Sequence, residues 1–308
     1  MGWAGWTILV LAILAVSMFG LWRWAMATQS VWLLDRVDAL ATSGQARTSG
    51  PIAYGDNPEQ VVVVTTPTKS APGPRPVVLF IHGGSWSHGH APDYAYVERN
   101  LAPEGYIGVS AGYRLVPGGE YPAMLEDGAA AVRWAVDNIA RYGGDPSRIY
   151  LMGHSAGAYN AVMLALDRRW LDKAGVAQSS IRGAIGLAGP YDFLPLDSEG
   201  TINAFGKAGD LDATQPIRFA RGDAPPLLLL TGDADTTVRP RNSAALARAM
   251  TAAGQPTQTV VFPGMTHAGI VLALSSPFAG EGDVKRAVAD FIARQEAQSS
   301  GDIQAPSR

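Results

Sequence analysis

One pentapeptide constrains this chain more than any other feature: G-H-S-A-G at residues 153–157. It follows an apolar run at residues 149–152 and precedes an Ala- and Leu-rich stretch at residues 161–166, an order typical of a strand-to-helix junction. Glycines on both sides permit a turn too tight for side chains, and such a turn leaves the central hydroxyl exposed on a strained backbone. We therefore predict a strand, a sharp turn and a helix here, with Ser155 as a nucleophile.

A second apolar run, at residues 76–81, ends in H-G-G-S-W at residues 82–86. A continuous apolar run is typical of a strand that is buried on both faces of a parallel sheet. A glycine-rich loop after such a strand can aim backbone N–H groups at a developing oxyanion, together with the N–H of the residue after the nucleophile. We predict these donors at Ala156 and among Gly83, Gly84 and Ser85, with Gly84 favoured. The alternative is an ordinary glycine-rich turn.

A serine nucleophile of this kind needs a histidine base and an acidic residue that orients it. We predict another buried strand at residues 225–230, and the loop after it is where we expect the acid. This run continues into T-G-D-A-D-T-T-V at residues 231–238, so two aspartates compete for the role. Asp233 directly follows the strand and can simply cap a turn. Asp235 is further into the loop and better placed to reach a histidine above the sheet, and we predict that it is the acid.

The base is predicted from chain order. Residues 258–262 have the pattern of another strand, and P-G-M-T-H at residues 263–267 follows. His267 is the only histidine after both the serine and the acid, which gives the order Ser, Asp, His. We predict that it is the general base. His88 and His90 lie in a loop with Asp93 near by, so a metal site there is the less favoured alternative. We expect no metal.

These four elements predict acyl transfer through a covalent intermediate on Ser155, with no metal or organic cofactor. The chain has no cysteine, which excludes cysteine nucleophiles, thiolate metal sites and disulfides. Its net charge of -3 and the lack of a basic cluster argue against nucleic acid as a partner.

The chain resembles the esterase/lipase branch of the α/β-hydrolase superfamily, which includes hormone-sensitive-lipase-like carboxylesterases, feruloyl and acetylxylan esterases, and prenylcysteine methylesterases. The shared stretches lie within residues 52–275 and include H-G-G-S-W at 82–86, Y-R-L at 113–115, Y-G-G-D-P-S-R-I at 142–149, G-H-S-A-G at 153–157 and G-P-Y-D at 189–192. Hormone-sensitive-lipase-like members have H-G-G-G in this loop, and this chain differs from them by having Ser85 at the last position.

The resemblance implies an α/β-hydrolase fold of class α/β, with a mostly parallel sheet, helices on both faces and a small cap. It implies a serine carboxylic-ester hydrolase. The short insertion at residues 191–223 and the bulk of Trp86 predict short to medium acyl esters of small molecules as substrates, with Trp86 and Tyr191 in the substrate pocket. A peptidase or amidase with the same triad is the alternative, and a non-catalytic binding protein on the same fold is a further one.

Apolar strands alternate with helix-like segments at residues 93–102, 124–142, 156–170, 242–253 and 283–295, which predicts one α/β domain over residues 51–296. Residues 191–223, rich in Gly and Asp, are expected to form the small cap. Residues 297–308 are polar and are predicted to be a disordered tail.

The N-terminus is the second distinctive region, because no charged side chain precedes Arg23 and residues 7–14 are apolar. We predict that residues 1–27 form a transmembrane anchor, with tryptophans at its ends as interfacial residues and with its orientation open. The rival is a signal sequence cleaved after A-M-A at residues 25–27, which would make the protein secreted or periplasmic. Residues 28–50 are predicted to be an amphipathic linker that lies on the membrane or covers the mouth of the site.

Overall fold

The computed structural model describes residues 31–280 and 283–304, together with residues 2, 3, 5–7, 9, 10, 12, 13, 17 and 20. Within these residues the strands form one eight-stranded sheet in the order β1-β2-β4-β3-β5-β6-β7-β8. β1 pairs with β2, and β2 with β4, in antiparallel fashion, and every other pairing is parallel. The strands are β1 (Ala46–Ala53), β2 (Val61–Pro67), β3 (Arg75–Ile81), β4 (Ile107–Ala111), β5 (Gly144–His154), β6 (Ile181–Leu187), β7 (Leu227–Gly232) and β8 (Gln258–Phe262).

The central strands are buried on both faces because their apolar runs have no polar alternation. The side chains of β7 are all buried, and those of β3 are buried from Val77 to the end of the strand. These strands occupy the runs predicted at residues 76–81 and 225–230. The parallel arrangement directs the carboxyl ends of β3, β5, β6, β7 and β8 to the same edge of the sheet, which is where ligand sites of such sheets are found.

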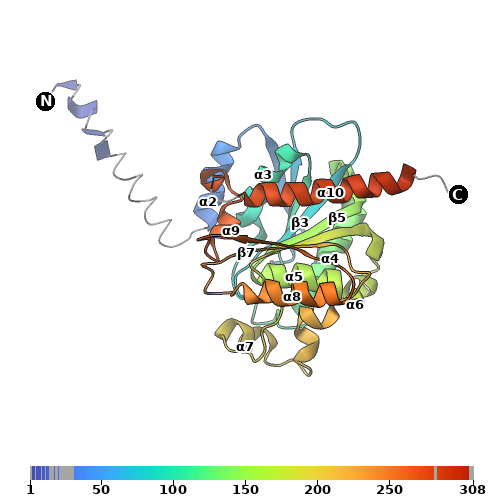
Figure 1. Ribbon diagram of the computed structural model, residues 1–308. Helices are drawn as coiled ribbons and strands as arrows, with labels where there is room; N and C mark the ends of the chain where they lie inside the picture. The colour runs from blue at the N-terminus through green and yellow to red at the C-terminus, as the bar shows by residue number, and fades with distance from the viewer. Residues whose placement is uncertain are drawn as a thin grey trace.

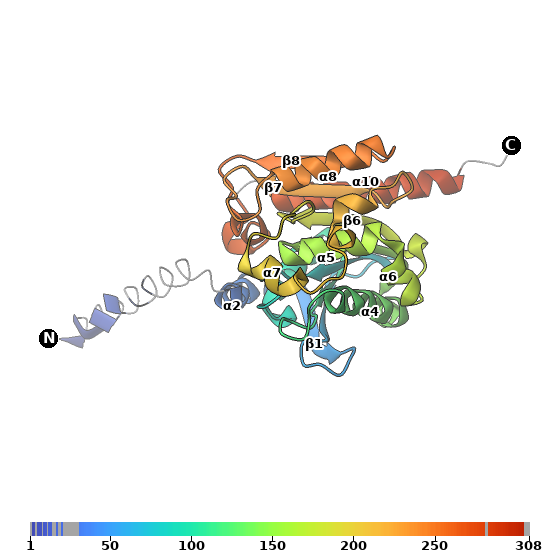
Figure 2. The same cartoon turned by 90° about the horizontal axis from the view of Figure 1, so that it is seen from below.

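Helices cover both faces of the sheet, as Figures 1 and 2 show. One face carries α2 (Val31–Ala41), α3 (Ala95–Leu101), α9 (Gly269–Leu272) and α10 (Val284–Gln304), and the other carries α4 (Ala123–Asn138), α5 (Ala156–Leu166), α6 (Arg168–Lys173) and α8 (Arg241–Ala252). Two apolar clusters, one on each side, fill the space between the helices and the sheet. The prediction of a mostly parallel sheet with helices on both faces is confirmed.

α5 is the helix that follows the G-H-S-A-G turn, and every one of its residues is buried. A helix that is apolar all round is expected to lie inside the molecule. It packs between β5, β6 and the neighbouring helices α4 and α6. The turn before it is therefore held between a buried strand and a buried helix.

The segment at residues 191–223 contains the short helix α7 (Glu199–Phe205) and the 3-10 turns η5 (Asp212–Thr214) and η6 (Pro216–Phe219). Its start is fixed by Asn242 of α8, whose Oδ1 accepts hydrogen bonds from the backbone N–H groups of Tyr191 and Asp192 at 3.0 Å each. Within the segment itself, the Gln215 side chain accepts a hydrogen bond from the Phe193 N–H at 2.9 Å. The predicted cap is thus a short segment tied to the domain by buried hydrogen bonds.

Three features differ from the predicted boundaries or lie beyond the described residues. β1 begins at Ala46, inside the stretch predicted as a linker, so the sheet starts before residue 51. α10 continues to Gln304, although residues 297–308 were predicted to be disordered, because its sequence has no proline before Pro306. The predicted anchor or signal at residues 1–27 falls largely outside the described residues. Among the helices that the structure describes, none is both long enough and apolar enough to cross a membrane.

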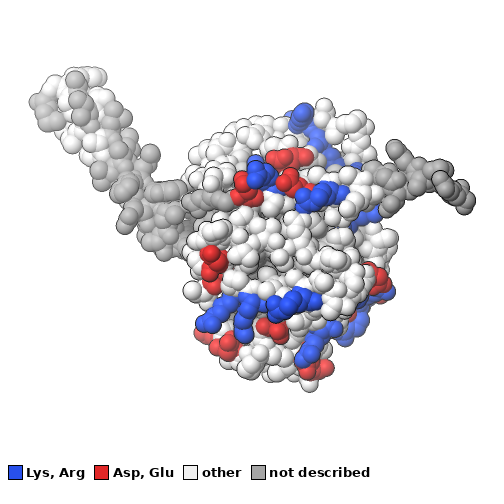
Figure 3. All heavy atoms as spheres, in the orientation of Figure 1, with Lys and Arg blue, Asp and Glu red and all other residues white. Residues whose placement is uncertain are grey.

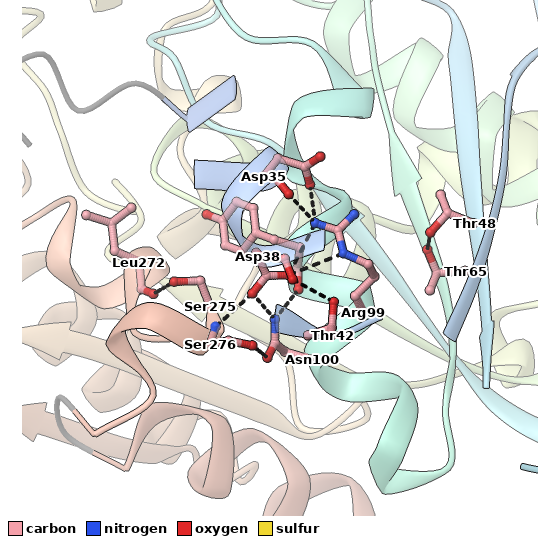
Figure 4. Close-up of polar contacts among 11 residues, drawn as sticks. Asp35, Asp38, Thr42, Thr48, Thr65, Arg99, Asn100, Leu272, Ser275 and Ser276 are labelled. Carbon is pink, nitrogen blue, oxygen red and sulfur yellow. Dashed lines mark hydrogen bonds and ion pairs between the residues drawn. The ribbon is translucent and has the colours of Figure 1, made fainter. Parts of the chain in front are cut away.

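The amphipathic segment at residues 31–40 forms α2, and a buried polar cluster attaches it to the domain (Figure 4). The fully buried Asp38 carboxylate accepts hydrogen bonds from Arg99 Nε at 3.2 Å, Asn100 Nδ2 at 2.8 Å and the Ser276 backbone N–H at 2.8 Å. Arg99 also donates to the Asp35 carboxylate at 2.7 Å. We call these five residues the Asp38 cluster. It joins α2 to α3 and to the 3-10 turn η7 (Ser276–Phe278) that follows α9.

The edge of the sheet at β8 lies between two bands of charged side chains. Figure 3 shows these bands along α10 and α8, with an uncharged zone between them. β8 pairs with β7 alone within the described residues, and Val261 on it is 53% exposed. An edge strand flanked by charged groups is less prone to pair with another chain.

Candidate active site

The turn at residues 153–157 has the geometry that its glycines predict. Ser155 lies at φ 54° and ψ -120°, outside the regions that a side chain normally allows. A Cβ on Gly153 would lie 2.2 Å from the Gly157 carbonyl oxygen, and one on Gly157 would lie 2.0 Å from the carbonyl oxygen of Ile81 on β3. Only glycine fits at either position, and the serine hydroxyl between them projects from the end of β5.

Three predicted residues are linked in series, starting from this hydroxyl. His267 Nε2 lies 2.8 Å from Ser155 Oγ, and His267 Nδ1 lies 2.8 Å from Asp235 Oδ2. They come from separate strand ends: the serine follows β5, the aspartate follows β7, and the histidine follows β8. The parallel sheet brings these ends together although Ser155 and His267 are 112 residues apart in the chain.

The Asp235 carboxylate is buried and held on both sides. Its Oδ1 accepts the backbone N–H groups of Thr237 and Val238 at 2.9 Å each, while Oδ2 faces His267. Burial acts to raise the pKa of Asp235, but the hydrogen bond and charge of His267 and the two backbone donors outweigh it and hold that pKa below its ordinary value. The carboxylate therefore stays ionised, and its bond fixes the proton of His267 on Nδ1.

Asp233, the competing aspartate, does not reach the histidine. It is exposed, and its Oδ1 accepts the Gly264 backbone N–H at 2.6 Å. It connects the loop after β7 to the loop after β8, which is the turn-capping role given as its alternative.

The loop after β3 lies directly against the serine. A Cβ on Gly83 would lie 3.2 Å from Ser155 Cβ and 2.9 Å from the His154 carbonyl oxygen, so the absent side chain lets this loop approach. Gly84 has φ 112°, and Ser85 is exposed with φ 52°. Among the described residues, neither the Gly84 N–H nor the Ala156 N–H has a backbone acceptor outside regular helix or strand pairing. Their donation to an oxyanion stays a prediction.

Residues with a strained backbone lie at the carboxyl ends of the strands, as Ser155 does. In the described part of the chain, the non-glycine residues with positive φ are Ser85, Trp86, Ser155 and Ala188. They follow β3, β5 and β6, at the carboxyl ends of adjacent strands. Strained residues of this kind cluster at functional sites, where the surrounding structure holds them in place.

His82, the first residue of the H-G-G motif, supports the loop from below. Its ring is fully buried and stacks between Tyr94 and Tyr113, with centroid distances of 5.5 and 4.7 Å. Its Nδ1 donates to the Gly83 carbonyl oxygen at 2.8 Å. Burial lowers the pKa of His82 to about 4, so the ring is neutral near pH 7. Sequence reasoning placed this residue in the loop without a role of its own.

The two predicted pocket residues are inside the core. Trp86 is 3% exposed, packs edge-on against Phe205 at 4.8 Å, and donates from Nε1 to Asn160 at 3.3 Å. Tyr191 is fully buried. As they stand, neither ring offers surface to a substrate, and their contact with one stays a prediction.

The histidines considered for a metal have other partners. His90 Nδ1 lies 2.9 Å from the Glu59 carboxylate, and His88 Nδ1 lies 2.8 Å from Ser87 Oγ. No group of three or more His, Asp or Glu side chains with metal-binding geometry occurs in the described part of the chain.

Known proteins with similar sequences carry esterase names. A probable isoprenylcysteine α-carbonyl methylesterase of Arabidopsis thaliana is 28% identical over 72% of this chain and 51% of its own length. Esterase LipQ of Mycobacterium tuberculosis is 31% identical over 64% of this chain and 51% of its own. The chain thus spans little more than half the length of these relatives.

A solved structure extends the comparison to the fold. Esterase B from Lactobacillus rhamnosis superposes with a TM-score of 0.71 at 21% identity, covering 90% of this chain and 97% of that one. Together with the sheet order, this similarity shows an α/β-hydrolase fold. The family model BD-FAE matches residues 64–250, which include the glycine-rich loop after β3, the serine turn and Asp235. The chain belongs to the BD-FAE family.

Proposed function

We propose that this protein is a serine carboxylic-ester hydrolase. The observation that carries the proposal is the continuous contact from Ser155 Oγ through the His267 imidazole to the Asp235 carboxylate, with both distances at 2.8 Å. The esterase names of its relatives support the same class of reaction. The chain's own residues supply every group that this reaction needs.

The geometry suggests the following steps. Neutral His267 takes the proton of Ser155 as Oγ attacks the acyl carbon, and Asp235 stabilises the imidazolium that forms. The N–H groups of Gly84 and Ala156 stabilise the oxyanion, each by about 3–4 kcal/mol. The imidazolium then protonates the leaving alcohol, and the acyl group remains on Ser155. Water activated by His267 attacks this ester and releases the acid.

The structure of the segment at residues 191–223 favours a substrate that is soluble and of modest size. It is short. Hydrogen bonds from the Tyr191 and Asp192 N–H groups to Asn242 tie its start to α8, and the Phe193–Gln215 hydrogen bond joins two parts of the segment, which favours a fixed cap over a large mobile lid. We infer short to medium acyl esters, hydrolysed without an oil–water interface. A peptidase or amidase with the same three residues is the alternative, and a peptide anilide assayed beside the esters separates the two.

The test is Ser155→Ala in the full chain, assayed on p-nitrophenyl esters of increasing acyl length and by fluorophosphonate labelling. We expect turnover and labelling to vanish while the fold, measured by circular dichroism, is kept. Ser179→Ala is the control, because Ser179 is exposed at the opposite end of the strands. Labelling that persists in Ser155→Ala, or that maps to Ser243, would contradict the assignment.

We further propose that the N-terminal segment holds the protein at a membrane. Described residues in it are helical and expose large apolar side chains, with Trp3 94% and Trp6 59% exposed. α2 adds Trp32, which is 54% exposed with the Arg36 guanidinium over its ring at 5.2 Å, a pair suited to an interface. Full-length protein is expected to fractionate with membranes and resist carbonate extraction. A soluble mature protein whose N-terminus is Thr28 by mass spectrometry would instead show a cleaved signal.

A further inference from the structure

His154, the residue before the proposed nucleophile, lies between two other loops of the candidate site. It is the last residue of β5, and 7% of its surface is exposed. Its Nε2 lies 2.9 Å from the backbone carbonyl oxygen of His267. On the other side of the ring, a Cβ on Gly83 would lie 3.1 Å from Nδ1. One side chain thus touches the base loop and the oxyanion loop while it belongs to the serine turn.

The hydrogen bond to His267 defines the state of the His154 ring. A carbonyl oxygen can only accept, so Nε2 carries the proton and donates it, and Nδ1 is bare. This hydrogen bond holds the backbone of His267. The side chain of His267 must keep its 2.8 Å contacts with Asp235 and Ser155. The helix α9 starts immediately after it, with Leu272 N–H donating to the Ala268 carbonyl at 3.0 Å, so the fixed point lies at the start of a rigid element.

The rings of His154 and His267 also pack together, with centroids 4.8 Å apart and planes tilted by 42°. A protonated ring at this distance would oppose the positive charge that forms on His267 during the reaction. Burial, followed by the effect of neighbouring His267, lowers the pKa of His154 to about 3. The ring is therefore neutral in the neutral range and leaves the charge of His267 unopposed.

We propose that His154 is the positioning residue of the base. Its Nε2–H holds the backbone carbonyl of His267 and so fixes the base loop relative to the turn that carries Ser155. This inference rests on the proposed function, since positioning has a kinetic effect only if Ser155 and His267 carry out the reaction.

Two matched variants of the full chain separate the hydrogen bond from packing. His154→Gln keeps an N–H donor without the ring, and His154→Phe keeps a ring without the donor. We expect His154→Phe to lower kcat on a soluble ester about 10- to 100-fold with little change in KM, because a misplaced base costs rate rather than binding. His154→Gln should recover most of that loss. If the residue only fills space, Phe would be tolerated and Gln would be the damaging change, and this order would overturn the proposal.

The pH profile gives a second readout. Since His154 is neutral throughout, kcat/KM of His154→Gln is expected to follow the same pH dependence as the native protein. An ionisation that disappears in the variant would mean that His154 itself titrates during turnover, and would contradict a positioning role.

Hydrogen–deuterium exchange tests the contact without relying on activity. Amides in residues 264–272 are expected to exchange faster in His154→Phe than in the native chain, with His154→Gln close to native and the amides of β3 and β5 unchanged in all three. Equal exchange of residues 264–272 in the three proteins would overturn the inference. If the native chain neither hydrolyses esters nor reacts with a fluorophosphonate, the proposed function fails while this measurement still decides whether His154 holds the loop.

Discussion

Two buried aspartates in this protein have similar surroundings and different partners. Asp235 and Asp38 both have fully buried side chains, and both accept hydrogen bonds from backbone N–H groups. Asp235 faces His267, whose imidazole takes up a proton in the proposed reaction. Asp38 faces Arg99, which is charged at every accessible pH. The first carboxylate can therefore stabilise a charge that appears during a reaction, while the second meets a charge that never changes.

The comparison shows that burial of a carboxylate does not by itself mark a reactive site. Removing a carboxylate from water costs several kcal/mol, and both sites offset this cost with hydrogen bonds, to which Asp38 adds the charge of Arg99. What distinguishes them is whether the cation is permanent. We expect changes at Asp235 to alter rate with little effect on stability, and changes at Asp38 to alter stability with little effect on rate.

The largest effect is expected at Asp235. Asp235→Asn keeps the size of the side chain but removes the charge that stabilises the imidazolium and fixes the His267 proton on Nδ1. If it acts as the acid of a serine triad, kcat should fall about ten thousandfold. Steady-state kinetics measures the rate, and thermal unfolding should show a melting temperature close to native. A variant that loses its fold instead would remove the contrast with Asp38.

The next effect is expected at Asp38. Asp38→Leu leaves Arg99 and the Ser276 N–H without this acceptor, and breaking a buried ion pair from one side costs about 3–5 kcal/mol. Urea unfolding measures the loss, and kcat at low temperature should stay within about twofold of native, since the cluster does not touch the triad. Asp35→Asn is the matched control: it removes a second carboxylate from the same Arg99 but leaves Ser276 bonded, so it should destabilise less. A selective fall in kcat in Asp38→Leu would break the comparison.

Glu98 extends the comparison to a carboxyl whose pKa is dominated by burial. Neither of its oxygens has a well-formed hydrogen bond in the described part of the chain, and burial raises its pKa to about 8 against the smaller lowering effects of its own backbone N–H, Arg99 and the Ser110 hydroxyl. The pKa of Glu98 in the folded protein is raised above its unfolded value of 4.5. The proton on Glu98 therefore contributes fully to the free energy of unfolding below pH 4.5, and this contribution is lost as the pH rises toward 8, by up to about 1.4 kcal/mol per pH unit.

Glu98→Gln removes the ionisation and should abolish this dependence. We expect the variant to match the native protein near pH 4.5 and to be the more stable of the two near pH 8, as measured by urea unfolding at both values. A stability difference that is the same at both pH values would show that Glu98 does not titrate in this range.

The smallest effect is expected at Asp233. Asp233→Asn keeps an oxygen that can accept the Gly264 N–H, so kcat should fall less than about tenfold. Measured beside Asp235→Asn, it shows which aspartate orients the base. If the two losses were reversed, the assignment of Asp235 would be wrong.

Sequence predicted the sheet and the meeting of Ser155, Asp235 and His267 because each of these residues lies in the turn or loop that follows an apolar run. Parallel strands bring such positions to one edge, so local patterns sufficed. The Asp38 cluster could not be found in this way, since Asp38 and Ser276 are 238 residues apart and no pattern in either segment refers to the other. Likewise, the sequence around Trp86 is the same whether its ring fills the core or contacts a substrate, and only packing decides between them.

The complete burial of α5 has a practical consequence for anyone who wishes to alter what this protein accepts. With no exposed face, the helix behind Ser155 leaves no position where a side chain can change volume without displacing a neighbour. Variation is far easier at residues 191–223, where Ile202 is 52% exposed. A mutant library confined to the exposed positions of that segment would sample new preferences while the serine and its histidine keep their separation.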